Sequence, residues 1–413
     1  MNNKNKNLIK DLKQIISTYL TKANAEDLFK LLDEKTSLQS AEENSFGDLD
    51  KTHLEYEVPK GYTYRIILDK IITICAKVLS EEKYNKLMLD IAELMFFSGE
   101  LTYSLEITED LLSKLQSDEK QAKLLAEDYL LISKIYWAQA NWEDCNYYVS
   151  EATKIFRSIN CEGGLAKCEN MLGTVYGEKG EFDQAQNHFN NALVYLGKEG
   201  DLALRAMIFT NLGIICTINN DYEKAIWNYK TAEEIFNEVK DSRRLARVYH
   251  NIGMLYTRME NFDSALDEFN KCITFSLEKD YLSNCAVAYL GKAFIYNKLS
   301  NQPLADAYAD KAMELAYKLN DTLSIADIYK IKGMIQNDMN NFELSEELFE
   351  NSIRLNKDIE NKLNEAESAV QLGELLQRSN RIEEAKPYLS VAANFFNKLN
   401  HENITAGLVE HSI

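Results

Sequence analysis

The sequence is poor in residues that interrupt helices. Only three prolines occur among 413 residues, and alternating β-branched runs are few. Both absences favour an all-helical chain, because proline breaks helices and alternation is typical of strands. No apolar run reaches the roughly 18–20 residues that a membrane-spanning helix needs. The residues after Met1 are polar and basic, with no apolar segment or cleavage site behind them. We expect a cytoplasmic protein.

Positive charge is also scarce, since the net charge is −19. Nucleic acids and anionic membranes are bound through basic surfaces. We therefore expect neither a nucleic acid nor a membrane as a partner.

The sequence lacks motifs that hold metals, cofactors or reacting groups. Its five histidines have no metal-ligand spacing, and there is no glycine-rich phosphate loop and no Gly-x-Ser-x-Gly motif. The abundant carboxylates are read as a solvated surface. We expect no cofactor, no metal and no catalytic residue, so that only an unrecognised site would make the chain an enzyme.

Seven cysteines occur, without a Cys-x-x-Cys motif. Cys145 and Cys272 occupy positions where other repeats have small residues, which predicts buried cysteines. A redox-sensing pair of Cys161 and Cys168 is the alternative.

What the sequence has is a repeat of 40 residues. The first small residue of each unit recurs at Ala126, Ala166, Ala206, Ala246, Ala286, Ala326, Ala366 and Ala406. Seven residues later come Ser133, Gly173, Gly213, Gly253, Ala293, Gly333 and Gly373. Small residues at fixed offsets mark places where two helix backbones approach closely, and such helix pairs bury their apolar faces by stacking. The pattern predicts an all-α, right-handed superhelical solenoid of stacked antiparallel helix pairs.

One unit shows the pattern in full. It has Leu172-Gly173, Tyr176, Ala185, Phe189 and Ala192, and the equivalents two units on include Ile252-Gly253, Tyr256, Ala265 and Phe269. These residues resemble the tetratricopeptide repeat family. The unit is longer than the family's usual 34 residues and lacks its closing proline. Units of 40 residues are familiar in bacterial scaffold and peptide-sensor members.

The chain divides by composition into two predicted parts. Residues 1–61 read as an N-terminal helical segment followed by a flexible linker, and residues 62–413 as the solenoid. Within the solenoid we expect a degenerate unit at 62–120, seven regular repeats at 121–400 and a cap at 401–413. A DNA-binding helix-turn-helix at residues 1–61 would need a tight turn and a basic second helix, and neither is present. A docking appendage or a plain cap remains open.

Three local features carry further expectations. Pro303 falls in the first turn of its helix, where proline is tolerated. Pro387 lies deeper, and we expect a late helix start or a kink. Trp142 and Trp227 are read as packing residues.

The resemblance implies that first helices line a concave groove in which ligands lie. Carried over by register, the inward positions follow each first alanine by one, four, eight, eleven and twelve residues, and the fifth residue lies nearby on the same helix. We call them the first-helix face. Our candidate binding residues are Lys134, Trp137, Lys167, Asn170, Asn211, Arg247, His250, Asn251, Arg258, Phe294, Asn297 and Lys298. Arginine and asparagine can hold a peptide backbone or a carboxylate. A chaperone-tail clamp is disfavoured, because Asn170 and Thr174 stand where the family's clamp has lysine and asparagine.

Three functions follow as hypotheses. The first is a non-catalytic scaffold or adaptor that binds a protein or peptide partner along the groove. The alternative is a peptide-gated bacterial regulator of the quorum-sensing type, in which a short peptide closes the superhelix. The third is an enzyme or an enzyme subunit.

Overall fold

A computed structural model describes residues 3–29 and 60–398, apart from residues 23, 24, 27, 117, 140, 180, 279, 280, 320 and 360. The described residues form eighteen α-helices and one 3-10 helix, with no β-strand among them. The prediction of an all-α fold of stacked helix pairs is confirmed. Most of the predicted linker and the whole predicted cap at 401–413 lie outside the described residues, and the predicted domain boundaries stay predictions.

The chain divides into two compact units, Met1–Met171 and Leu172–Ile413, and the division falls within the residues of helix α8. The elements of the first unit are α1 (Asn3–Tyr19), α3 (Lys60–Val78), α4 (Glu81–Phe97), α5 (Leu101–Leu115), η1 (Glu119–Gln121), α6 (Ala122–Ala138), α7 (Trp142–Ser158) and the start of α8 (Glu162–Glu178).

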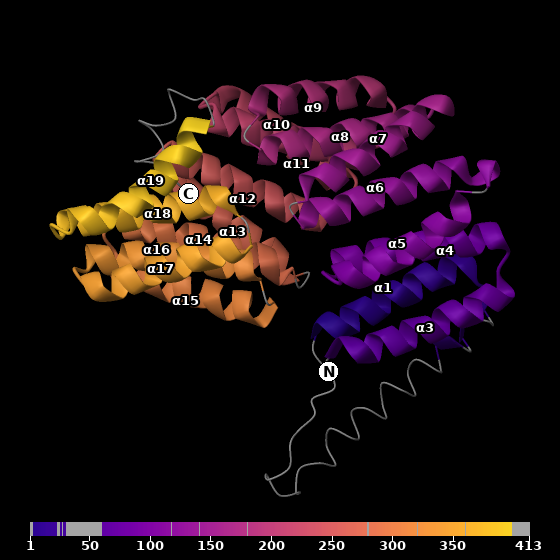
Figure 1. The fold of residues 1–413 in the computed structure, drawn as a ribbon, viewed down its shortest axis with the longest axis horizontal. Coiled ribbons are helices and arrows are strands. Elements are labelled where there is room, and N and C mark those ends of the chain that lie inside the picture. The colour runs from indigo at the N-terminus through magenta and orange to yellow at the C-terminus, as the bar shows by residue number, and fades with distance from the viewer. Residues whose placement is uncertain are drawn as a thin grey trace, which may run out of the picture. The chain divides into compact units, whose positions relative to one another are not determined.

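The N-terminal helix α1 packs against α4 in the first unit (Figure 1). Its buried residues Leu12 and Ile16 share one apolar core with Leu87 and Ile91 of α4. The hydroxyl of Tyr19 donates a hydrogen bond of 2.5 Å to the carboxylate of Asp90 on α4. The N-terminal helix is therefore part of the helical stack.

The second unit continues with the helix pairs that the 40-residue period predicts. Its helices after α8 are α9 (Phe182–Leu196), α10 (Leu202–Ile218), α11 (Tyr222–Glu238), α12 (Ser242–Arg258), α13 (Phe262–Glu278), α14 (Leu282–Lys298), α15 (Gln302–Leu319), α16 (Thr322–Asp338), α17 (Phe342–Asp358), α18 (Lys362–Arg378) and α19 (Ile382–Lys398). Figure 1 shows the pairs as antiparallel helices. Ala246, the first small residue of its unit, lies inside α12, the first helix of a pair, as the period predicts.

Aromatic rings pack directly against the backbone at glycines of the repeat. A methyl group placed on Gly213 would be 2.5 Å from the ring of Tyr229, and one on Gly333 would be 2.6 Å from the ring of Phe349. The ring lies sixteen residues after its glycine, on the partner helix of the same pair. This close approach explains why large residues are missing from that register.

Tight turns close the pairs in a recurring way. Residues 220, 260, 300, 340 and 380 all have φ between 56° and 62°. In one of these turns the amide of Asn261 donates to the carbonyl of Tyr256, and that of Glu260 to Thr257. This is the Schellman arrangement, which satisfies the last carbonyls of a helix.

Several local expectations have definite outcomes. Pro303 lies in the first turn of α15, as predicted, whereas α19 begins at Ile382 and takes Pro387 into its interior, so the late start was wrong. Trp227 is not packed as predicted, because 60% of its surface is exposed; its ring meets that of Phe209 edge to face at 5.5 Å.

The cysteines behave as small core residues. None of the seven forms a disulfide, and all except Cys161 are buried. Burial raises the pKa of the Cys168 thiol to about 11, which leaves little reactive thiolate at neutral pH. This outcome weakens the redox alternative.

Candidate ligand-binding face

The candidate residues lie on first helices in both units. In the first unit α6 carries Lys134 and Trp137, and the first half of α8 carries Lys167 and Asn170. In the second unit they lie on three successive first helices, and the list is Asn211 on α10, then Arg247, His250, Asn251 and Arg258 on α12, then Phe294, Asn297 and Lys298 on α14. Consecutive first helices of this unit pack directly on one another, from α10 to α18. The candidates of the second unit therefore lie on adjoining helices.

Helix α12 places three polar side chains within five residues. Arg247 has no acidic partner among the described residues, and its surface is exposed. Nevertheless, burial of the guanidinium and the nearby charges of Arg243 and Arg244 lower its pKa. A side chain that is open to solvent and still closely surrounded by protein is expected on a concave surface.

His250 and Asn251 carry polar atoms that no described residue satisfies. Neither Nδ1 of His250 nor Nδ2 of Asn251 has a hydrogen-bond partner in the described part of the chain, although both atoms are buried. Burial, aided by the charge of Arg247, lowers the pKa of His250 to about 4. The imidazole is therefore neutral at pH 7. Buried polar atoms without partners are rare in folded proteins and need an explanation.

At the other end of α12, Arg258 is anchored. Its guanidinium donates a hydrogen bond of 3.3 Å to the carbonyl of Thr217 near the end of α10. Asn211, on α10, is half-buried. Arg258 thus ties two first helices together, and its remaining donors stay available.

The three candidates on α14 differ in accessibility. Phe294 is 6% exposed and packs in an apolar cluster with Ala305 and Ile331. Asn297 is 5% exposed, and its amide donates a hydrogen bond of 2.7 Å to Asp338 of α16. Its Oδ1 has no partner among the described residues. Lys298 is exposed and stands over the Phe294 ring at 5.4 Å. The structure places Phe294 in the core, so we no longer expect it to be an open ligand contact.

In the first unit the candidates are partly engaged. Lys134 pairs with Glu93 of α4 at 3.3 Å. Trp137 is half-buried, and its Nε1 finds no partner among the described residues. Lys167 is exposed, and Asn170 is half-buried.

The candidate set omitted a buried ion pair further along the same face. Lys330 of α16 and Glu367 of α18 lie 2.5 Å apart, with side chains only 5% and 7% exposed. Asp327 stands 3.9 Å from the same ammonium, and burial raises the pKa of its carboxyl to about 6. Glu367 and Asp327 are the residues directly after their first alanines, so the register alone would have found them.

Comparison with known proteins supports the repeat. Residues 204–278 match the tetratricopeptide repeat family. The uncharacterised protein Ycf37 of Cyanophora paradoxa is 35% identical over 82 residues, which are 20% of this chain and 46% of that protein. The matched segment thus spans less than half of that relative.

Solved structures resemble the fold over most of the chain. One is a Rap protein in complex with Competence and Sporulation Factor, with 15% identity and a TM-score of 0.63, covering 82% of this chain and 93% of that one. Another is the Rap conjugation gene regulator of plasmid pLS20 in complex with the Phr* peptide, with 12% identity and a TM-score of 0.57, covering 77% and 96%. The chain contains tetratricopeptide repeats, as the sequence indicated.

No described helix is long and apolar enough to cross a membrane. In the same part of the chain, no three His, Cys, Asp or Glu side chains gather as metal ligands would.

Proposed function

We propose that this chain is a non-catalytic scaffold whose first-helix face binds a protein or peptide partner. The observation that carries the proposal is the set of unsatisfied polar groups on α12. His250 offers an unpaired ring nitrogen, Asn251 offers an unpaired amide, and Arg247 lacks an acidic partner among the described residues. An extended ligand supplies the carbonyls, amides and carboxylates that such groups require.

The packing of the second unit supports a concave first-helix face. First helices contact the next first helix, whereas no comparable contact joins consecutive second helices in the described part of that unit. Helices that are closer together lie on the inner side of a curved stack. The first-helix face would then be the inner wall of a groove.

The charge on this wall favours an anionic group at α12. Arg247 and Arg258 supply two positive charges there. Further along, Lys330 is already neutralised by Glu367, and Asp327 adds a negative charge. We infer that a ligand carboxylate, either a chain end or an acidic side chain, lies near α12.

A second candidate function is a peptide-gated regulator. Its support is the resemblance in fold to a gene regulator solved with a peptide ligand. A regulator of this kind should compact when a short peptide binds. A scaffold should bind its partner with little change in dimensions, which small-angle X-ray scattering measures.

Native mass spectrometry of the protein purified from its own cells would identify what is bound. A bound mass of about a kilodalton would favour the regulator, and a folded protein would favour the scaffold. The double variant Arg247→Glu with Asn251→Ala should weaken binding of the captured partner while helical content and melting temperature stay near those of the unaltered protein.

A matched control carries the same changes on second helices. Arg157→Glu with Asn190→Ala alters exposed residues of α7 and α9 and should leave affinity unchanged. If both double variants bind equally well, the site is not on α12. Turnover of a substrate by the purified chain would contradict the non-catalytic proposal.

A further inference from the structure

An aromatic stack recurs between the two helices of a pair. Tyr136 stacks on Tyr148 with ring centres 5.5 Å apart, and Tyr296 stacks on Tyr308 at 5.4 Å. Tyr176 and His188 stand at the same two positions of their own pair and stack at 5.1 Å. In each case the second ring comes twelve residues after the first.

The pair α12–α13 departs from this arrangement. Tyr256 keeps the first position, but Glu268 replaces the second ring. Both residues line a pocket of about 470 Å³, together with Asp267, Thr274 and Phe275. The pocket is open to solvent, because Asp267 and Thr274 in its lining are exposed.

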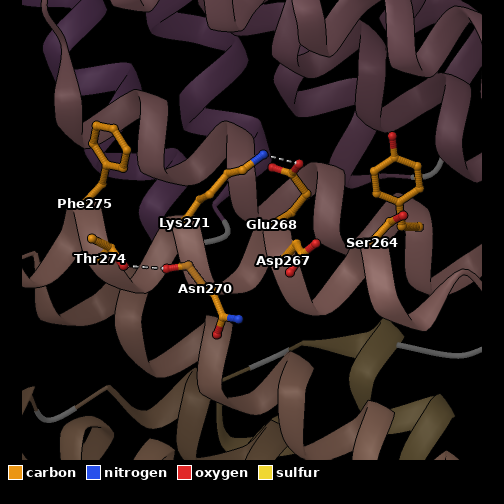
Figure 2. Close-up of a pocket in the computed structure, with 8 residues that line it drawn as sticks. Ser264, Asp267, Glu268, Asn270, Lys271, Thr274 and Phe275 are labelled. Carbon is orange, nitrogen blue, oxygen red and sulfur yellow. Dashed lines mark hydrogen bonds and ion pairs between the residues drawn. The ribbon is translucent and has the colours of Figure 1, made fainter.

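The pocket carries more negative than positive charge. Figure 2 shows Glu268 beside the adjacent Asp267 on α13, with Lys271 reaching back to Glu268. The ammonium of Lys271 donates a hydrogen bond of 2.6 Å to Oε1 of Glu268. The other oxygen, Oε2, is buried and has no partner among the described residues. One acceptor of Glu268 is therefore unused, and Asp267 has an exposed side chain beside it.

In the next pair an internal cation occupies the corresponding place. Lys292 lies 4.3 Å from the ring centre of Tyr308, over the aromatic face. The residue that corresponds to Lys292 in α12 is Ile252, which brings no charge. The pocket at Glu268 thus has an aromatic ring and two carboxylates, and its own cation, Lys271, pairs with only one oxygen of Glu268. Lys292 also reaches its edge, where the ammonium donates a hydrogen bond of 2.8 Å to Asn270.

We propose that this pocket binds an arginine side chain presented by a partner protein, at a surface separate from the first-helix face. The guanidinium pairs with Glu268 Oε2 and Asp267, and its plane lies on the ring of Tyr256. A planar group with five donors suits two carboxylates and a ring better than a compact ammonium does. Asp267 and Thr274 are exposed, so an arginine on another protein's surface can reach the pocket.

The test is an NMR titration of the full 413-residue chain with N-acetyl-arginine amide and with its neutral analogue N-acetyl-citrulline amide. The arginine probe should bind about tenfold more tightly, as expected for a charged hydrogen-bonded pair. Glu268→Gln should abolish that preference, and Asp267→Asn should reduce it. Lys271→Gln should strengthen arginine binding, because it removes the competing internal cation.

Two control variants should bind the arginine probe as the unaltered chain does. Glu347→Gln changes the residue of α17 that corresponds to Asp267. The residue there that corresponds to Glu268 is the apolar Leu348, so this variant should leave arginine binding unchanged. Arg247→Glu should also leave it unchanged, since the first-helix face is a different surface. Equal binding of the two probes, or binding that survives Glu268→Gln in a folded variant, would overturn the proposal. Loss of arginine binding in Arg247→Glu would also overturn it, without bearing on the proposed scaffold function.

Discussion

The ring of Phe269 lies against the backbone of Gly253, so that a methyl group on that glycine would be 2.7 Å from the ring. Phe269 is fully buried, and it cannot move aside without displacing its neighbours. We expect Gly253→Ala to lower the free energy of unfolding by about 1–3 kcal/mol through overpacking. Urea unfolding followed by circular dichroism measures this change.

The matched control is Gly177→Ala, also inside a first helix. There the nearest atom would be the Cβ of Ala185 at 4.0 Å. Alanine should stabilise that helix by roughly 0.5–1 kcal/mol, because glycine is a poor helix former. If both substitutions changed stability in the same direction, the close approach would not be what keeps position 253 small.

The recurring turns predict a stabilising substitution. Glu260 has φ of 56°, a left-handed conformation that disfavours a side chain with a Cβ atom. We expect Glu260→Gly to raise the unfolding free energy by roughly 0.5–1 kcal/mol, measured by thermal melting. Asn340→Gly is the control, because asparagine already tolerates its φ of 62°. A larger gain at residue 340 than at residue 260 would contradict this explanation.

The sequence predicted the helix pairs well because their determinants are local. Small residues at fixed offsets set where backbones meet, and this information is complete within one repeat. Depth of burial is not local: register placed Phe294 on the first-helix face, but Ile331 of another helix covers it in the core. The sequence also predicted an N-terminal helical segment without revealing α4 as the partner of α1.

The pocket at Glu268 was missed for another reason. A single glutamate on a helix is read as a solvated charge. Its meaning appears only when the same position is compared across repeats, since Tyr148, His188 and Tyr308 show that a ring fills that space in three other pairs. Position-by-position comparison of polar as well as small residues would have identified it.

A buried carboxyl group predicts pH-dependent stability. Asp128 of α6 is fully buried, and neither of its oxygens has a partner among the described residues. Burial raises its pKa to about 8. The folded state therefore holds a proton that the unfolded state releases above its ordinary pKa near 4. Through this group, stability should be complete below about pH 4, fall as the pH rises and level off above about pH 8.

Asp128→Asn tests this linkage because it removes the titrating group. The variant should be more stable than the unaltered chain by on the order of 2–4 kcal/mol at pH 8, with the difference vanishing towards pH 4. Asp183→Asn, at an exposed position of α9, should show no such pH-dependent difference. A difference that stays constant across pH 4–8 would mean that Asp128 does not change its protonation on folding.

The buried ion pair of Lys330 and Glu367 predicts different losses of stability for single and double variants. Lys330→Met leaves the carboxylate of Glu367 buried without its cation, and the loss should be about 3–5 kcal/mol. The double variant Lys330→Met with Glu367→Leu removes both charges and should recover most of that loss, since two apolar side chains can replace a buried ion pair. A double-mutant cycle followed by urea unfolding gives the coupling between the two residues.

The contrast with an exposed pair decides whether burial is the cause. Lys386 and Glu383 of α19 are also 2.5 Å apart, but their side chains are 63% and 82% exposed. Lys386→Met should therefore change stability by less than about 1 kcal/mol, because water already solvates the remaining carboxylate. If the two lysine variants lost similar stability, distance alone would govern these pairs. If only Lys330→Met were costly, the pair would join α16 to α18 by excluding water from two charges, and a ligand could not compete for that lysine without breaking the contact between the helices.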